Sequence, residues 1–404
     1  MAKHAATPAG VPIITADPYS QENLTSPHAL YEQLREAGPV VYIERYGTWG
    51  IARYEQVNTV FRDWKTYSSA AGVGLSNFRK EKPWRPPSLL LESDPPTHTH
   101  AREALGPLLS PRALEPLREP FGREASALVD RLATSGSFDA VTQLVEVYTL
   151  KVFGDAVGLP DEGRERLLVY GTLLFNSFGP RNQLLEDAQA AAQDVPQWVA
   201  DNCHREALRP GGFGAQLWAL ADTGKISEEW AGLLVRSLLG AGIDTTVNGI
   251  NAAIYGLATH PDQWRLLRED PSLATAACEE GIRWDSPVQI FFRTTTRDVE
   301  IEGVHIPAGE KVQCFLGAAN RDPRRWRDPD RFDLKRDTAG HLGFGMGVHR
   351  CIGLSVARLE TEVLLAVLAR RVDQIEISGQ PRRKPNNTLH AWASLPLAVH
   401  SAPA

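Results

Sequence analysis

The sequence predicts a mainly helical protein with a smaller β region, folded as one domain over residues 23–404 behind an irregular arm over residues 1–22. From about residue 97 to residue 285, apolar side chains recur at steps of three and four, the spacing of helices that are buried on one side. Short β-rich runs lie on both sides of this stretch. The 404 residues, 43% hydrophobic and 23% charged, have the composition of a globular protein and show neither a linker nor an internal repeat.

The N-terminal elements are a helix, a hairpin and a second helix. The first helix is expected to be capped by Ser26, to carry Pro27 in its first turn and to end at Gly38. Two short runs, VVYIE and TWGIARY, predict a β-hairpin. The second helix is expected over residues 54–63. The proline-rich segment after it, to about residue 96, predicts a long functional loop.

One helix in the middle of the chain is expected to be unusually long. It begins at the capping residue Ser227 and continues to about Thr259, well beyond the average helix length. After Pro287 the pattern changes to strands in VQIFFRTTT and DVEIEGVHI. An arginine-rich coil is expected over residues 320–340, then a final helix over residues 352–370 and strands in the tail.

Charge and cysteine usage limit the class of protein. The chain has 43 Lys+Arg against 49 Asp+Glu, a net charge of −6, which argues against nucleic acid or an anionic membrane as the main partner. Its 4 cysteines are widely spaced and form neither a Cys-x-x-Cys pair nor a zinc pattern. The first residues lack the apolar core of a signal peptide, and no apolar run approaches the length of a membrane span. We therefore expect a cytoplasmic protein.

A glycine-rich segment before the final helix carries the most informative cysteine. It reads FGMGVHRCIG over residues 344–353 and places Cys351 at a helix N-terminus, where the dipole and free N–H groups stabilise a thiolate. Its glycines permit positive φ and close approach of the backbone to a flat ligand. The spacing Phe-Gly-x-Gly-x-His-x-Cys-x-Gly resembles the signature of the cytochrome P-450 superfamily. The resemblance implies that fold as a single haem domain, haem b (iron protoporphyrin IX) as cofactor and Cys351 as the axial ligand of its iron. The loop residues that it places at the haem are Phe344, Gly345 and Gly353.

Two further segments match the same family in the same order. Glu280 and Arg283 correspond to its Glu-x-x-Arg pair, which in the family fixes a later arginine; Arg331 is the expected partner, with Arg321 and Arg336 as alternatives. The segment DPPTH with an arginine one turn later resembles the part of the family that binds the haem propionates. The residues assigned to the propionates by this resemblance are His98, Arg102, Arg293 and His349.

The predicted long helix contains LGAGIDTT over residues 239–246. Its two glycines each cost about 1 kcal/mol relative to alanine in a helix, and tight helix packing is one explanation for them. The stretch also resembles the oxygen-binding groove of the family, which implies that Asp244 relays protons from solvent and that Thr245 takes part in oxygen activation. This acid–alcohol pair favours dioxygen and reducing equivalents over hydrogen peroxide as the source of the oxygen atom.

Several stretches are similar to a narrower group, the bacterial enzymes that oxidise para-substituted benzoates. These are KEKPWRPPSLLLESDPP, LLFNSFGP, LLVRSLLGAGIDTTVNG and SPVQIFFRTTTR. The similarity implies that Ser88 and Ser237 hydrogen-bond the substrate carboxylate and that Arg85 and Arg236 supply positive charge. The residues that it places around the aromatic ring are Leu91, Phe175, Phe178, Ala241, Val288 and Phe291.

One departure concerns the acid-binding end. A glutamine that helps to enclose the carboxylate in those relatives aligns with Pro196, with Gln197 beside it, so the choice among benzoates and cinnamates can differ. The expected reaction is O-demethylation of 4-methoxybenzoate-type acids, with hydroxylation of para-alkyl groups.

The resemblance also implies electron-transfer partners, namely an iron–sulfur ferredoxin and an NAD(P)H-dependent ferredoxin reductase. The expected basic docking face for an acidic ferredoxin is formed by Arg102, Arg112, Arg350 and Arg358. Three alternatives stay open at this point: a haem-thiolate peroxygenase, a monooxygenase of another small aromatic or hydrophobic substrate, and a non-enzymatic haem sensor or carrier.

Overall fold

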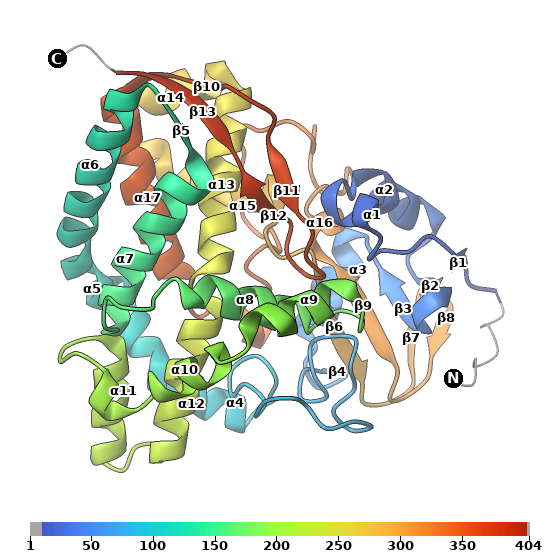
Figure 1. Ribbon diagram of the computed structural model, residues 1–404. Helices are drawn as coiled ribbons and strands as arrows, with labels where there is room; N and C mark the ends of the chain where they lie inside the picture. Colours follow the sequence, from blue (N-terminus) through green and yellow to red (C-terminus); the bar gives the residue numbers. More distant parts are fainter. Residues whose placement is uncertain (1–9, 402–404) are drawn as a thin grey trace.

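The central amphipathic helices pack into layers, and β-rich runs that precede and follow the helical stretch meet in a sheet beside them (Figure 1). The computed structural model describes residues 10–401. The helices are α1 (Gln21–Thr25), α2 (His28–Ala37), α3 (Tyr54–Arg62), α4 (Thr97–Leu105), α5 (Pro111–Leu114), α6 (Arg118–Ser135), α7 (Glu146–Val157), α8 (Arg166–Asn176), α9 (Gln183–Ala192), α10 (Val195–Asp201), α11 (Phe213–Asp222), α12 (Glu228–Ala241), α13 (Asp244–Thr259), α14 (Pro261–Glu269), α15 (Ala274–Asp285), α16 (Leu316–Ala319) and α17 (Leu354–Arg371). The prediction of a mainly helical fold is confirmed.

The strands form one larger sheet and several small ones. They are β1 (Ile13–Ile14), β2 (Val41–Ile43), β3 (Thr48–Ile51), β4 (Tyr67–Ser68), β5 (Ser137–Asp139), β6 (Ile290–Thr295), β7 (Val299–Ile301), β8 (Val304–Ile306), β9 (Lys311–Phe315), β10 (Val372–Ile377), β11 (Arg382–Lys384), β12 (Ala391–Ser394) and β13 (Pro396–Ser401). The larger sheet has the order β1-β2-β3-β9-β6-β4. It therefore joins the N-terminal hairpin to strands more than 200 residues later in the chain.

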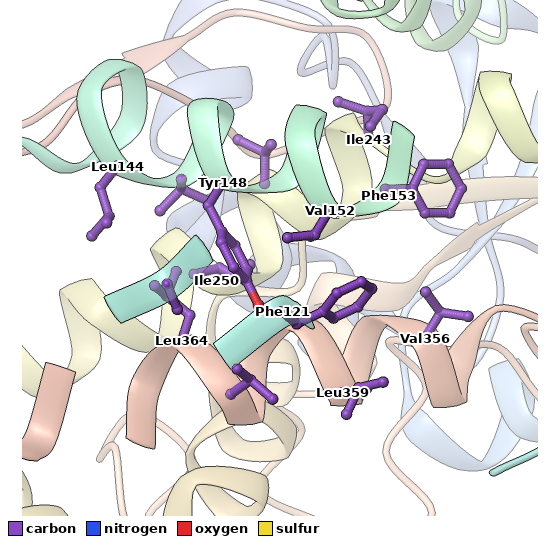
Figure 2. Close-up of a cluster of buried hydrophobic side chains, with 14 of the residues drawn as sticks. Phe121, Leu144, Tyr148, Val152, Phe153, Ile243, Ile250, Val356, Leu359 and Leu364 are labelled. Carbon is purple, nitrogen blue, oxygen red and sulfur yellow. The ribbon is translucent and has the colours of Figure 1, made fainter. Parts of the chain in front are cut away.

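The helical core lies where α6, α7, α13 and α17 meet, and Figure 2 shows the side chains that fill it. Tyr148 of α7 is 1% exposed and donates its hydroxyl to the carbonyl oxygen of Glu360 in α17, at 3.2 Å. Phe121 of α6 and Leu364 of α17 are buried beside it. Burial of each such large apolar side chain contributes roughly 1.5–3 kcal/mol. This core gives α13 and α17 a common rigid support.

The predicted N-terminal elements are confirmed except at their boundaries. The hairpin pairs β2 with β3 antiparallel, and α3 occupies the second predicted helix. Ser26 is not the cap of α2, because the N-cap is Pro27 and no side chain bonds there. The arm is not wholly irregular either: β1 pairs in parallel with β2, and α1 begins at Gln21. Residues 1–9 of the predicted arm lie outside the described residues.

Two predictions in the second half of the chain need correction. The expected long helix is two helices, α12 and α13, separated at Gly242 and Ile243. The sequence reading also missed β9, whose residues Lys311–Phe315 are buried on both faces and therefore show no alternation of apolar and polar side chains. The final helix and the tail strands are confirmed. Within residues 10–401, none of the helices combines the length and apolar character needed to cross a bilayer.

Candidate active site

The cysteine loop is a tight turn that packs against α3 and leads into α17. Gly345 and Gly347 adopt φ of 66° and 68°, as predicted. A side chain at Gly347 would overlap the backbone of Phe61, so glycine is also required there for packing. The backbone N–H of Cys351 donates to the carbonyl of Phe344 at 2.8 Å, which closes the loop. These contacts fix the position of Cys351 three residues before α17 begins.

Opposing influences act on the Cys351 thiol. Its side chain is solvent-accessible but lies deep among protein atoms, and desolvation raises its pKa. The backbone N–H groups of Gly353 and Leu354 and the charges of Arg102 and Arg350 lower that pKa. Each of these donors and charges favours a thiolate, the form in which cysteine binds a metal.

Two histidines and two arginines from distant segments lie near this loop. The rings of His98 and His349 are 4.2 Å apart, and neither ring nitrogen of His98 has a hydrogen-bond partner among residues 10–401. Arg293 is 4% exposed, with its guanidinium 4.4 Å from the ring of Phe61. Arg102 donates to the carbonyl of Arg350 at 2.7 Å. Burial is the main influence on His98 and lowers its pKa to about 4, so its ring is neutral at pH 7.

This arrangement fits the two carboxylates of a haem. Buried polar groups normally have partners, and the bare ring nitrogens of His98 therefore call for a ligand with acceptor atoms. Arg293, with its largely buried guanidinium, likewise needs an anion. The structure brings the four predicted propionate residues together and places the cysteine loop beside them. His98, Arg102, Arg293 and His349 would hold the propionates, and Cys351 would bind the iron.

The break between α12 and α13 lies where oxygen activation was predicted. The hydroxyl of Thr245 donates to the carbonyl of Ala241 at 2.7 Å, which is the carbonyl that a continuous helix offers to the backbone N–H of residue 245. A side chain at Gly242 would overlap the ring of Phe153. The helix therefore opens at residues 242–243, and the glycines serve close packing as well.

Asp244 begins α13 and its carboxyl group is buried. The atom Oδ2 has no hydrogen-bond partner among the described residues and lies so close to Gly171 of α8 that any side chain there would overlap it. Burial is the main influence and raises the pKa of Asp244 to about 7; Lys384 lowers this pKa and Glu146 raises it. A carboxyl group with a pKa near neutrality can both accept and release a proton under physiological conditions.

The predicted acid-binding residues converge on one place. The hydroxyl oxygens of Ser88 and Ser237 are 3.3 Å apart. Arg236 donates to the carbonyl of Pro86 at 2.7 Å. Arg85 forms an ion pair with Glu92 at 2.8 Å, a partner that the sequence reading missed because both residues lie in the irregular loop. Glu92 offsets one of the two arginine charges, so the group carries one net positive charge.

The predicted aromatic wall is also assembled. The ring centroids of Phe175 and Phe178 are 5.9 Å apart, as are those of Phe178 and Phe291, both in edge-to-face geometry. Leu91 and Val288 pack against the same cluster, and Ala241 ends α12 beside the helix break. The sequence reading missed other wall residues, since no local pattern connects them with the phenylalanines; these are Val73, Leu174, Leu389 and Ala391.

A cavity of about 730 Å³ borders this region, and of the residues predicted at the substrate it is lined by Arg85, Phe178 and Arg236. Pro196 of α10 lines it, as the departure in the sequence suggested, whereas Gln197 bonds Asp201 of its own helix. At position 196 the cavity wall therefore carries no hydrogen-bonding side chain.

The Glu-x-x-Arg pair is completely buried, and its third member differs from the prediction. Arg283 binds both carboxylate oxygens of Glu280, at 2.7 and 2.8 Å. Arg336 completes the group, with its Nε 3.1 Å from Glu280. Arg331 is wrong as the partner, because its side chain is 60% exposed and turns towards Asp262. Arg321 bonds the carbonyl of Trp284 and pairs with Asp330.

Comparisons with known proteins show which family the chain is similar to. A family model described as Cytochrome P450 matches residues 218–397. Cytochrome P450 CYP199A2 from Rhodopseudomonas palustris is 55% identical over 395 residues, 98% of this chain and 96% of its own length. Vitamin D(3) 25-hydroxylase from Pseudonocardia autotrophica is 33% identical over 349 residues, 85% of each chain. A solved structure of the cytochrome P450 CREJ in complex with (4-ethylphenyl) dihydrogen phosphate has a TM-score of 0.85 and 26% identity, covering 95% of this chain and 99% of that one.

The near-complete coverage, the fold and the cysteine loop lead to one conclusion. The chain belongs to the cytochrome P450 family of monooxygenases, whose cofactor is haem b bound through a cysteine thiolate.

Proposed function

We propose that this monooxygenase oxidises para-substituted benzoic acids, chiefly by O-demethylation of 4-methoxybenzoate-type acids and also by hydroxylation of para-alkyl groups. The observation that carries the proposal is the pair of serine hydroxyls 3.3 Å apart at one end of an aromatic wall, with Arg85 and Arg236 beside them. A buried carboxylate requires charge-assisted hydrogen bonds, because its desolvation without partners is costly. A flat ring suits the edge-to-face phenylalanines.

The cofactor residues have defined roles in this proposal. Cys351 would bind the iron through its thiolate, which the backbone donors around it stabilise. His98, Arg102, Arg293 and His349 would hold the propionates. When bound, haem with a thiolate ligand supplies the activation of dioxygen that allows one oxygen atom to be inserted into a C–H bond.

The protein residues hold the substrate and determine which carbon is oxidised. The hydroxyls of Ser88 and Ser237 would hydrogen-bond the carboxylate, that of Ser237 turning from the carbonyl of Leu233 to which it donates at 2.9 Å, and Arg236 adds positive charge. The wall orients the ring so that the para substituent is the part of the substrate presented for oxidation. Insertion of oxygen into a methoxy C–H bond gives a hemiacetal, which breaks its C–O bond to release formaldehyde and the 4-hydroxy acid.

Asp244 and Thr245 supply protons to the reaction. Asp244 has a pKa near 7 and an oxygen without a hydrogen-bond partner among residues 10–401, so it can hold a proton and pass it towards Thr245. Thr245 holds its hydroxyl on the Ala241 carbonyl at the helix break. The break in the helix at residues 242–243 gives room for proton transfer from Asp244 towards Thr245, beside the aromatic wall.

Reducing equivalents come from a ferredoxin and an NAD(P)H-dependent reductase in this proposal. On the predicted docking face, Arg112 and Arg350 are exposed. Arg102 and Arg358 are committed within the protein, the former to the carbonyl of Arg350 and the latter to Glu279 at 2.6 Å. The proposed docking charges are thus Arg112 and Arg350. A cytoplasmic location is part of the proposal, because none of the four cysteines is paired in a disulfide, as expected in a reducing compartment.

The comparison with CREJ supports the class of substrate. That protein is solved with a para-substituted aryl phosphate, which is a small anionic aromatic molecule with its charge opposite an alkyl group. The scaffold therefore accommodates ligands of this general form.

Spectral titration of the ferric protein tests the proposal. Addition of 4-methoxybenzoate is expected to shift the Soret band from low spin to high spin. With NADH, a ferredoxin reductase and a ferredoxin, formaldehyde and 4-hydroxybenzoate should then form in equal amounts. The methyl ester of 4-methoxybenzoate is the matched control, because it keeps the ring and loses the charge. Absence of a spin shift with several para-substituted benzoates, or equal affinity for the acid and its ester, would contradict the substrate assignment.

A further inference from the structure

The C-terminal end of α8, which carries Phe175 and leads to Phe178, is held by a turn from the C-terminal part of the chain. The last carbonyls of a helix lack partners within the helix, and here this turn supplies them. The hydroxyl of Thr388 donates to the carbonyl of Phe175 at 2.8 Å. The amide nitrogen Nδ2 of Asn387 donates to the carbonyl of Asn176 at 3.0 Å.

Asn387 makes further bonds in the same place. Its backbone N–H donates to Oδ1 of Asn176 at 2.9 Å. Its side-chain oxygen accepts from Asn182 at 2.8 Å, and its Nδ2 also donates to Oδ1 of Asn182 at 3.1 Å. Asn387 is 1% exposed, and a side chain at Gly179 would overlap its Cβ. One amide group therefore joins both ends of the α8–α9 connection to the turn.

The opposite side of the same segment is held by the loop after β4. The backbone N–H of Leu75 donates to the carbonyl of Phe178 at 2.8 Å. A side chain at Gly74 would overlap the backbone of Phe178. The neighbouring Val73 accepts from the backbone N–H of Phe292 in β6 at 2.8 Å. The phenylalanine-bearing segment is thus clamped between two loops.

The turn itself is anchored to the framework of the site. Arg383 binds Asp285 of α15 through both oxygens, at 2.7 and 2.8 Å. Leu389 pairs with Val288 in an isolated β-bridge, and both residues belong to the aromatic wall or pack against it. The position of the turn is therefore set by the same elements that carry Val288 and Phe291. Figure 1 shows the hairpin of β11 and β12, in red, reaching towards α8 and α9.

From this connection we propose that Asn387 is a positioning residue that sets the separation between the α8 side and the β6 side of the aromatic wall, and thereby the size of para substituent that the enzyme accepts. Asn387 does not touch the substrate; it acts through Phe175 and Phe178. The part of this proposal that concerns para substituents rests on the proposed function, whereas the part that concerns the position of the wall does not.

Loss of the Asn387 side chain should loosen one side of the wall only. The carbonyl of Asn176 and the amide of Asn182 would lose their buried partner, while the backbone bond from residue 387 to Asn176 remains. Because the variant loses more than one buried hydrogen bond of Asn387, local opening should increase about tenfold, which corresponds to about 1.4 kcal/mol. The acid-binding serines lie on other segments and should keep their positions.

The test compares Asn387→Ala with wild type as ferric holoproteins. Hydrogen exchange of the Leu75, Ser177 and Gly179 amides should accelerate about tenfold. The neutral iron ligand 4-phenylimidazole reports the width of the pocket whatever the natural substrate is, and its affinity should change. The ratio of the dissociation constants for 4-methoxybenzoate and 4-isopropylbenzoate should shift about tenfold towards the larger acid.

Two further variants keep the test decisive. Asn251→Ala removes an equally buried asparagine whose hydrogen bond goes to Val247 of its own helix, and it should lower stability without a change in the ratio. In Gly179→Ala the added methyl group overlaps Asn387 and should likewise alter the ratio of the two benzoate dissociation constants. This variant tests the proposal even if Asn387→Ala fails to fold.

The outcomes separate the two proposals. Unchanged amide exchange together with unchanged 4-phenylimidazole affinity would overturn the positioning role. A wild-type protein that binds neither benzoate would overturn the proposed substrate class; exchange and 4-phenylimidazole affinity would then still decide whether Asn387 positions the wall. A change in the ratio of equal size in Asn251→Ala would show a general loss of stability and overturn the specific role.

Discussion

At the scale of single residues, Asp244 has the clearest dependence on pH. Burial raises the pKa of this carboxyl group to about 7, above its value of about 4 in an unfolded chain. The folded protein therefore binds more protons than the unfolded chain between about pH 4 and pH 7. Stability falls as the pH rises through this window and stays lower above it.

We expect Asp244→Asn to remove this dependence. A shift of three pKa units corresponds to about 4 kcal/mol at most, so the variant should be more stable than wild type at pH 8 and similar at pH 4. Denaturant unfolding at several pH values measures the difference, with the exposed Asp187→Asn as control. The same variant should consume NADH with less product formed. An unchanged pH profile of stability would contradict the assignment of the raised pKa to the burial of this carboxyl group.

Ser237 gives a second prediction at this scale. Ser237→Ala removes one of the two hydroxyl donors at the acid-binding end and should weaken binding of 4-methoxybenzoate by about 1–2 kcal/mol. Spectral titration measures this change. The methyl ester should bind equally well to both proteins. An equal loss of affinity for the methyl ester would show that Ser237 acts through packing and not through the carboxylate.

The sequence predicted individual site residues where a motif of fixed spacing exists. The cysteine loop, the histidines and the acid–alcohol pair follow such motifs, and the structure brings the histidines to the cysteine loop. The sequence could not predict that Glu92 pairs with Arg85 or that Leu389 belongs to the aromatic wall. These contacts depend on how loops fold over one another, and loop conformation leaves no periodic pattern in the sequence.

At the scale of elements, the break between α12 and α13 shows how local chemistry overrides a helical pattern. Periodicity of apolar residues continues through residues 242–243, and for that reason the sequence predicted one long helix. The hydroxyl of Thr245 donates to the carbonyl of Ala241. The absence of a side chain at Gly242 allows the ring of Phe153 to pack against the helix backbone. Neither influence changes the spacing of apolar side chains, so the break was not visible in the pattern.

Alanine substitutions of two glycines test this account. Gly242→Ala should destabilise the protein by about 1–3 kcal/mol, because the added methyl group overlaps the ring of Phe153. Gly249→Ala, in the body of α13, meets only ordinary contacts from 3.6 Å outwards and should stabilise by up to about 1 kcal/mol through helix propensity. Thermal unfolding of both holoproteins measures the contrast. Equal effects of the two substitutions would contradict the packing explanation.

At the scale of the whole molecule, the buried Glu280 group connects the helical layers with the cysteine loop. Arg283 bonds the carbonyl of Asn320 at 2.9 Å, and the side chain of Asn320 accepts from the backbone N–H of Leu342 at 2.7 Å. The arginine-rich coil is therefore tied to α15 on one side and to the cysteine loop on the other.

The fold class, the hairpin and the final helix could be predicted because each has a strong local pattern. The third member of the Glu280 group could not, since several arginines lie in the coil and only tertiary packing selects Arg336.

Substitution of the two arginines distinguishes the observed partner from the predicted one. Arg336→Ala leaves an oxygen of the buried Glu280 with fewer donors and should cost about 3–5 kcal/mol, with faster loss of haem. Arg331→Ala removes an exposed side chain and should change stability by less than about 1 kcal/mol. Denaturant unfolding and haem transfer to apomyoglobin measure both effects. A larger loss of stability for Arg331→Ala than for Arg336→Ala would contradict the assignment of Arg336 as the third member of the Glu280 group.

The cluster formed by His98, Arg102, Arg293 and His349 has a consequence for biosynthesis. It gathers two guanidinium groups and two imidazoles around one carboxylate, that of Asp94, so an anionic ligand that adds negative charge there should stabilise the native chain. Since a ligand that binds the native state alone stabilises it by mass action, porphyrin supply during synthesis should govern the yield of correctly folded polypeptide. Cells fed a porphyrin precursor should accumulate more intact protein from the same amount of messenger RNA.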